Sequence, residues 1–115
     1  MRYLLLIYEE PPATPMPQED WAAMMSQYGA FTTWLEEHGW LRTAAALQDV
    51  ATATTVSVRD DQRLVTDGPF AETKEHLAGF YVIDVASLDD AIEAAARIPS
   101  AKSGKIEIRP IAETG

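Results

Sequence analysis

GFYVIDVASLDDAIEAAARIP, residues 79–99, joins an apolar segment directly to an amphipathic one. Residues 79–85 carry apolar side chains on both faces of an extended chain, which predicts a strand inside a sheet. Ser87 is the expected helix N-cap with Asp90 as its capping-box partner, and Pro99 ends the helix. Three residues are expected to face the core from this helix: Leu88, Ile92 and Ala95. The stretch therefore predicts a strand–helix unit, from which the rest of the fold is built outward.

The N-terminal third of the chain repeats this strand–helix pairing. RYLLLIY at 2–8 is short and apolar, which predicts a strand buried on both faces, and the prolines at 11–17 allow only a connection. Pro17 suits the first position of a helix that runs to about His38, with Gly39 as its C′ stop. One apolar stripe recurs at three- and four-residue steps and is expected to pack inside: Trp21, Met24, Met25, Tyr28, Phe31, Trp34 and Leu35.

The middle and the end of the chain supply the remaining strands. Residues 41–53 are rich in Ala and Thr and have little pattern, which predicts a connection. TTVSVR at 54–59 alternates and is β-branched, so it predicts a strand that turns at 60–62 into a second short strand at 63–66. KIEIRPI at 105–111 is a last alternating strand.

This order of elements predicts an α+β fold of the ferredoxin-like, split βαβ type, in which a four-stranded antiparallel sheet carries two helices on one face. The whole chain, residues 1–115, is expected to form one domain. The helices cover one face only, yet the strands at 3–8 and 79–85 are apolar on both faces, so a partner surface is expected on the open face. The simplest partner is a second copy, which predicts a homodimer whose two sheets enclose a shared, barrel-like core.

Composition excludes several classes of function. The chain has 115 residues and a formal net charge of −9, which argues against binding nucleic acid through a basic face and against an anionic membrane surface. There is no cysteine, which excludes disulfides, thiolate nucleophiles and thiolate metal sites. The apolar run at 3–8 is too short to span a bilayer or to act as a signal peptide, so a cytoplasmic location is expected.

The connection TDGPFAETKEHLAGFY at 66–81 concentrates turn residues and charge. Asp67 lies at a strand end beside the stiff Gly68-Pro69 pair, as a positioned general base requires. The structural alternative is an Asx-type turn in which Asp67 caps the backbone amides that follow it. Phe70 is expected to anchor the loop, with contact to a substrate as the alternative.

A charged cluster follows within this connection, formed by Glu72, Lys74, Glu75 and His76. Its ordinary interpretation is a solvated face. Its functional interpretation turns Lys74 or His76 toward Asp67, with Lys74 binding the substrate and His76 acting as a catalytic acid or base near neutral pH. Because His38 and His76 are the two histidines of the chain, a multi-histidine metal site is not expected, and any chemistry is predicted to need no cofactor.

Two further candidates lie on the outer strands. If Ile106 and Ile108 face the helices, Arg109 faces the interior of the dimer, where it could hold a carboxylate or enolate oxygen of a substrate. The alternative for Arg109 is an intersubunit salt bridge with Glu107 or Asp84. Tyr8, at the end of the first strand, could present its hydroxyl to the same space, or it could be a core tyrosine with one satisfied hydroxyl.

Several segments together resemble the YCII-related family, and specifically its DGPF-type branch: MRYLLLIY, MMSQYGAFTTWLEEHG, ATATTVSVRD, DGPFAETKE, SLDDAIEAAARIP and IEIRPI. The resemblance covers nearly the whole chain and implies a dimeric α+β barrel. It implies two kinds of function, because the wider family includes lyase-like enzymes acting on chlorinated aromatic rings, while some DGPF-type proteins look like companions of extracytoplasmic-function sigma factors. The His–Asp pair proposed for the wider family has its His on the first helix, where this chain has none before His38, so the pair is not carried over.

Two functions are therefore expected as alternatives. The first is a small-molecule-binding protein that extends to a cofactor-free acid/base lyase or isomerase, with Asp67 as the base and Arg109 as the anion holder. The second is a non-catalytic regulatory or interaction module associated with a sigma factor. A pocket with converging polar groups favours the first, and a cavity filled by side chains favours the second.

Overall fold

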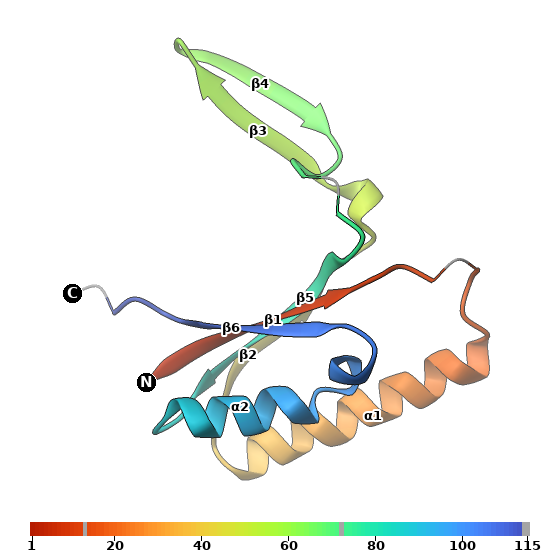
Figure 1. Ribbon diagram of the computed structural model, residues 1–115, viewed down its shortest axis with the longest axis vertical. Helices are drawn as coiled ribbons and strands as arrows, with labels where there is room; N and C mark the ends of the chain where they lie inside the picture. The colour runs from red at the N-terminus through yellow and green to blue at the C-terminus, as the bar shows by residue number, and fades with distance from the viewer. Residues whose placement is uncertain (13, 72, 114–115) are drawn as a thin grey trace.

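The computed structural model describes residues 1–12, 14–71 and 73–113, and Figure 1 shows its elements along the chain. Strands and helices follow the split βαβ order, with a hairpin inserted before the third strand of the main sheet. The elements are β1 (Arg2–Glu9), α1 (Gln18–Glu37), β2 (Leu41–Ala46), η1 (Val50–Thr52), β3 (Thr54–Arg59), β4 (Gln62–Asp67), β5 (His76–Asp84), α2 (Leu88–Arg97), η2 (Pro99–Lys102) and β6 (Lys105–Pro110), where η marks a short 3₁₀ helix.

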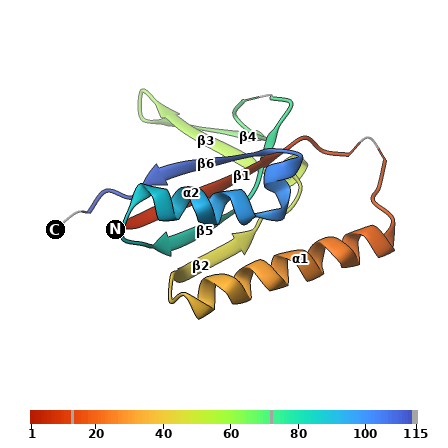
Figure 2. The same cartoon turned by 60° about the horizontal axis from the view of Figure 1, so that its bottom comes forward.

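The main sheet has four strands in the order β2-β5-β1-β6, and every neighbouring pair is antiparallel. β1 and β5 occupy the centre of the sheet, which agrees with the apolar side chains that both strands carry on both faces. α1 and α2 both lie on one face of this sheet (Figure 2). The predicted α+β, ferredoxin-like fold is therefore confirmed.

The prediction of a connection over residues 41–53 is wrong, because Leu41–Ala46 forms β2, an edge strand of the main sheet. The backbone holds this strand in place: it pairs with β5 along its length, and just before it the Asp84 N–H donates to the Trp40 carbonyl over 2.8 Å. Alanine has little intrinsic preference for strands, but pairing to a central strand overrides that preference. The side chains of β2 after Leu41 stay exposed, so the alternation that signals a strand is missing.

β3 and β4 form a separate two-stranded sheet that projects from the main body (Figure 1). The strands predicted at 54–59 and 63–66 are confirmed, and Asp60 and Asp61 between them have φ values of 53° and 62°, as a type I′ hairpin turn needs. The projecting hairpin helps raise the radius of gyration to 16.3 Å, against about 13 Å for a compact chain of roughly 100 residues. Several of its apolar side chains are exposed: Val56, Val58, Leu64 and Val65.

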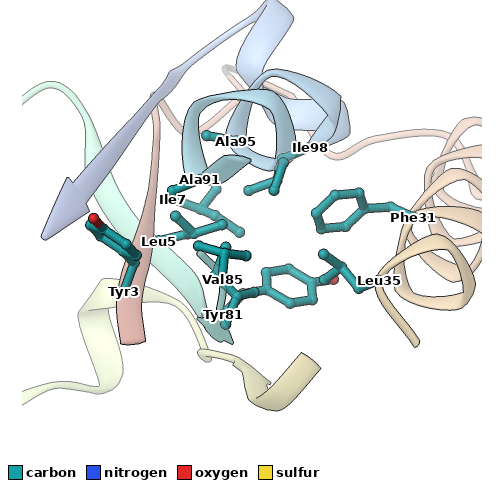
Figure 3. Packing of buried hydrophobic residues seen from close by; sticks show 12 residues of the cluster. Tyr3, Leu5, Ile7, Phe31, Leu35, Tyr81, Val85, Ala91, Ala95 and Ile98 are labelled. Carbon is teal, nitrogen blue, oxygen red and sulfur yellow. The ribbon is translucent and has the colours of Figure 1, made fainter. Parts of the chain in front are cut away.

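The hydrophobic core lies between the sheet and the two helices (Figure 3). Alternate residues of β1 and β5 point into it, and the C-terminal half of α1 adds Phe31 and Leu35. The Phe31 ring meets the Tyr81 ring edge to face, with 5.1 Å between the ring centroids. Trp34 packs against the core from its edge. The predicted stripe of α1 is thus inside the protein only in its C-terminal half, since Trp21 and Met25 are exposed.

The predicted core face of α2 is wrong at two positions. Leu88 and Ile92 are 51% and 49% exposed, whereas Ala95 is buried as predicted. The buried face consists of alanines, Ala91, Ala94 and Ala95, and the chain adds Ile98 just beyond the helix. Small side chains allow a helix to approach a sheet closely, so the alanine face packs inward and the larger residues turn to solvent.

The helix ends follow their capping signals closely. Ser87 caps α2 by accepting a hydrogen bond from the Asp90 N–H over 3.3 Å, as predicted. Gly39 follows α1 with φ at 69°, the left-handed conformation expected of a C′ glycine. Pro17 is the N-cap of α1 rather than its first helical residue, one position from the prediction. Neither α1 nor α2, nor any other helix within the described residues, is long and apolar enough to cross a membrane.

The sheet face opposite the helices is apolar at its centre, and we call it the open face. Leu4 and Leu6 of β1 alternate with buried core residues and pair with Val82 and Phe80 of β5. On the outer strand β6, Ile106 and Ile108 pack against the core, so the condition set for Arg109 is met, and Glu107 and Arg109 lie on the open face. The open face thus consists of Leu4, Leu6, Phe80, Val82, Glu107 and Arg109.

Candidate functional site

A cavity of about 450 Å³ lies between the N-terminal half of α1 and the strands β2 and β5, and we call it the α1 cavity. One wall is formed by side chains of α1: Trp21, Met24, Met25 and Tyr28. The opposite wall is formed by residues 44–47 and 78–81, with Ile7, Glu9 and Ser100 completing the lining. The volume falls in the range that accommodates a small organic molecule, and the lining is mostly apolar, as such sites require.

Small residues on the sheet keep this space open. Ala46 lies opposite Gly79 across the β2–β5 pair, and Ala44 lies opposite the buried Tyr81. A Cβ atom on Gly79 would come within 2.8 Å of the Ala45 carbonyl oxygen, so the close backbone approach of β2 requires glycine there. Because Ala44, Ala46 and Gly79 present little or no side chain here, the first half of α1 stands over a cavity rather than over a packed core.

The α1 cavity has one polar end. The Tyr28 hydroxyl is hydrogen-bonded to the Ser100 hydroxyl, and Ser100 is only 3% exposed. The Ser100 carbonyl accepts hydrogen bonds from the Ser103 and Gly104 N–H groups, which fixes η2. Burial raises the pKa of Tyr28, and the nearby negative charge of Glu9 adds to the increase. Tyr28 therefore stays protonated at neutral pH and can donate or accept a hydrogen bond.

Asp67 and Phe70 do not line the α1 cavity, because they lie where β4 ends and the hairpin rejoins the main body. The turn is held by Gly68, whose N–H donates to the Ala53 carbonyl over 2.6 Å and whose carbonyl accepts from the Thr55 hydroxyl over 2.8 Å. Gly68 has φ at 98°, which glycine adopts without strain. Phe70 is 90% exposed, so it does not anchor the loop by packing against its own chain, and the predicted anchoring role is wrong.

The predicted Asx-type cap is also wrong, since the Asp67 side chain is exposed and makes no hydrogen bond to any part of the chain that the structure describes. Asp67→Asn and Asp67→Ala should each change the free energy of unfolding by less than about 0.5 kcal/mol. Thr55→Val, which removes the hydroxyl that binds Gly68, should cost about 1 kcal/mol and is the matched comparison. Urea unfolding of the three variants measures both effects. A clear loss in Asp67→Ala that Asn rescues would restore the cap.

Within the described residues, the charged cluster after the hairpin forms no ion pair with Asp67. Glu75 forms an ion pair with Lys105 of β6, and its carbonyl accepts from the Thr73 hydroxyl over 2.6 Å. Lys74 is exposed, and Glu72 lies outside the described residues. His76 begins β5, is half-buried and lies directly opposite Glu9 of β1.

Tyr8 and Arg109 are brought to the same side of the sheet, on the neighbouring strands β1 and β6. The Tyr8 hydroxyl donates to the Glu107 carboxylate over 3.4 Å. Partial burial and the negative charge of Glu107 raise the pKa of Tyr8, whereas Arg109 lowers it. Asp84, one predicted partner of Arg109, is engaged elsewhere: its carboxylate accepts a hydrogen bond from the Met1 amine over 3.0 Å, which lowers the pKa of Asp84.

The other histidine, His38, belongs to an aromatic cluster at the end of α1. The His38 ring lies 4.4 Å from the Trp34 ring and 4.9 Å from the Trp40 ring, measured between centroids, and His38 Nδ1 is 2.8 Å from the Trp34 carbonyl oxygen. Among the described residues, no three side chains of the metal-ligating types come together. His38 therefore has a packing environment rather than a place in the α1 cavity.

Sequence reasoning did not find the residues of the α1 cavity. The α1 residues form an apolar stripe in the sequence, but an apolar stripe at helical spacing is found both over a packed core and over a cavity. Glu9 and Ser100 come from segments far apart in the chain, and nothing in their local sequence indicates that they meet Tyr28. A weak signal was present in the alanine-rich segment at 44–46, because small residues facing a helix leave space.

The fold and the cavity define the class of the protein: an α+β, ferredoxin-like protein with a cavity of small-molecule size beneath its first helix. The chain belongs to the YCII-related family, since the YCII-related domain matches residues 1–114. It is also similar to an uncharacterised protein of Rhizobium meliloti (strain 1021), with 37% identity over 115 residues that cover 97% of this chain and 93% of the relative. The predicted family is therefore confirmed.

Proposed function

We propose that this YCII-related protein binds a small, largely apolar molecule in the α1 cavity and that it acts as a homodimer. The observation that carries the proposal is an apolar cavity of about 450 Å³ that ends in a partly buried pair of hydroxyl groups. A region that serves packing alone is normally filled by side chains, as protein interiors are. Here the sheet presents Ala44, Ala46 and Gly79 to the space instead.

The open face supports the homodimer. Its apolar centre, Leu4 and Leu6 with their partners on β5, is the kind of continuous patch that marks a contact surface. Glu107 and Arg109 lie beside it on one strand with opposite charges. In an isologous contact the glutamate of one copy meets the arginine of the second, so the same surface is complementary to itself. In such a dimer Tyr8 and Arg109 would face the enclosed interior, where the role predicted for them applies.

Acid/base catalysis would extend this binding function to a lyase or isomerase. Among the residues that the structure describes, Glu9 is the one carboxylate that lines the α1 cavity, and it lies beside the Tyr28–Ser100 hydroxyl pair. A proton transfer within this cavity would therefore use Glu9 as its base and Tyr28 as a hydrogen-bond donor. Asp67 and His76 lie outside the lining, so the geometry favours Glu9 over them for a reaction in this place.

The binding function predicts a specific response to filling the cavity. A metabolite library screened by thermal shift should yield a stabilising ligand, which contributes about 2.7 kcal/mol at roughly 100 times its dissociation constant. Ala44→Leu places a large side chain in the cavity and should abolish this shift, because ligand and side chain compete for one space. Ala22→Leu, the same change at an exposed position of α1 outside the cavity lining, should leave the shift intact.

Two outcomes would contradict the proposal. A ligand that stabilises Ala44→Leu as well as it stabilises the wild-type protein binds elsewhere. A library without any stabilising ligand would favour the regulatory alternative, a non-catalytic module that contacts a protein partner such as a sigma factor.

A further inference from the structure

Within the described part of the chain, one charged side chain lines the α1 cavity. Glu9 is half-buried and lines the cavity, while the other lining side chains are aliphatic, aromatic, thioether or hydroxyl groups. No Lys, Arg or His of residues 1–12, 14–71 and 73–113 is among the lining residues. A ligand in this cavity therefore meets a negative charge and no positive one.

Glu9 is not neutralised by its neighbours within the described residues. Its nearest cationic neighbour along β6, Lys105, forms its ion pair with Glu75 instead. His76 lies opposite Glu9 across the β1–β5 pair, but no ion pair joins them. The charge of Glu9 also reaches the polar end of the cavity, since it helps to raise the pKa of Tyr28. The carboxylate is thus available to a ligand that enters beside Tyr28.

Aromatic rings accompany this carboxylate on both walls of the cavity. Trp21 and Tyr28 line it from α1, and the Tyr81 ring lines it from β5. The faces of such rings attract cations, and the attraction grows when the cation is shielded from water. A single carboxylate among aromatic rings is a pattern that favours an organic cation over a neutral molecule and disfavours an anion.

We propose that the ligand of the α1 cavity is an organic ammonium compound, with an aryl or alkyl body among the Trp21 and methionine side chains and its ammonium group directed to Glu9. This inference rests on the proposed binding function and names the class of its ligand. A carboxylate ligand would have to lose its water next to an unpaired negative charge, which is strongly unfavourable. The formal net charge of −9 acts in the same direction, because it raises the local concentration of cations around the protein.

Three probes of nearly equal shape test the inference: phenethylamine, 2-phenylethanol and phenylacetate, titrated into the wild-type protein by calorimetry at pH 7. Phenethylamine should bind about tenfold or more tightly than phenylacetate, as hydrogen bonds to a charged group imply. Glu9→Gln should remove this preference, whereas Glu36→Gln, an equal change of net charge at an exposed site outside the cavity, should preserve it. Glu9→Lys should invert the preference toward phenylacetate, which keeps the test independent of one variant.

The possible failures are distinguishable. Equal binding of the alcohol and the amine, or a preference that survives Glu9→Gln, would overturn the ammonium inference and leave the binding function intact. The inference is equally overturned if no probe binds and the metabolite library returns only neutral or anionic ligands that Ala44→Leu excludes. A library in which nothing binds in this cavity removes the binding function itself.

Discussion

Leu35→Ala should lower the free energy of unfolding by about 2–5 kcal/mol, the range measured for leucines truncated in a packed core. Leu35 is 0% exposed and contributes to the cluster that joins α1 to the sheet. Truncation removes the transfer free energy of the lost atoms and leaves a hole that the neighbouring Phe31 and Ile98 fill only in part. Urea denaturation followed by circular dichroism measures the change, and an unchanged m-value keeps the comparison valid.

Leu88→Ala is the matched control for this loss. The two leucines lose the same atoms, but Leu88 is 51% exposed, so its substitution should cost less than about 1 kcal/mol. The contrast tests the packing of both helices. The periodicity of α2 predicts that Leu88 lies in the core, whereas in the structure Leu88 is exposed and Leu35 of α1 is buried. Equal losses at the two positions would mean that α2 packs with a different face from the one observed.

The fold followed from sequence where the pattern was set by burial on a central strand. β1 and β5 are apolar on both faces because they lie in the middle of the sheet, so their sequences alone predict that they are central strands. α2 shows the limit of the same reasoning. Its alternatives, a leucine–isoleucine face and an alanine face, both repeat at helical spacing, and the distance between helix and sheet decides between them. That distance depends on how the helix and the sheet pack together, so the sequence of the helix alone does not predict it.

The edge strand and the hairpin show a second limit. β2 exists because β5 offers it backbone partners, and its alanine-rich sequence carries no alternation that reports this. The segment at 54–66 has a strong local strand pattern and does form strands, but these pair only with each other. Local sequence therefore predicted the presence of strands β3 and β4 correctly and could not say which sheet they join.

The candidate site was harder to predict than the fold because it is defined by what is absent. Charge and turn residues at 66–81 drew the prediction to Asp67, whereas the cavity arises from small residues on β2 and β5 beneath the first half of α1. Its polar end joins Glu9, Tyr28 and Ser100, which only the assembled fold brings together. Such a space has no local signature, since each segment that lines it looks like ordinary core or surface.

Leu6→Asp should convert the proposed homodimer into a monomer that keeps its fold. Leu6 lies on a central strand and pairs with Phe80 in the middle of the open face, so a two-fold contact through that face would bury both copies of the introduced carboxylate. An unpaired buried charge costs roughly 3 kcal/mol or more, which weakens the dimer at least about a hundredfold. Sedimentation velocity at micromolar concentration measures the assembly, and circular dichroism verifies that the fold persists.

Ile92→Asp is the control that separates this effect from a general effect of charge. Ile92 is an exposed apolar residue on the outer side of α2, on the opposite side of the molecule from the open face, and the same substitution there should leave the dimer intact. A wild-type protein that sediments as a monomer at micromolar concentration would exclude the homodimer outright. A dimer that survives Leu6→Asp but dissociates with Val56→Asp would instead place the contact on the projecting hairpin, whose valines are exposed in the single chain. The open face would then be expected to have a different partner, because soluble proteins rarely leave an apolar patch across two central strands exposed to water.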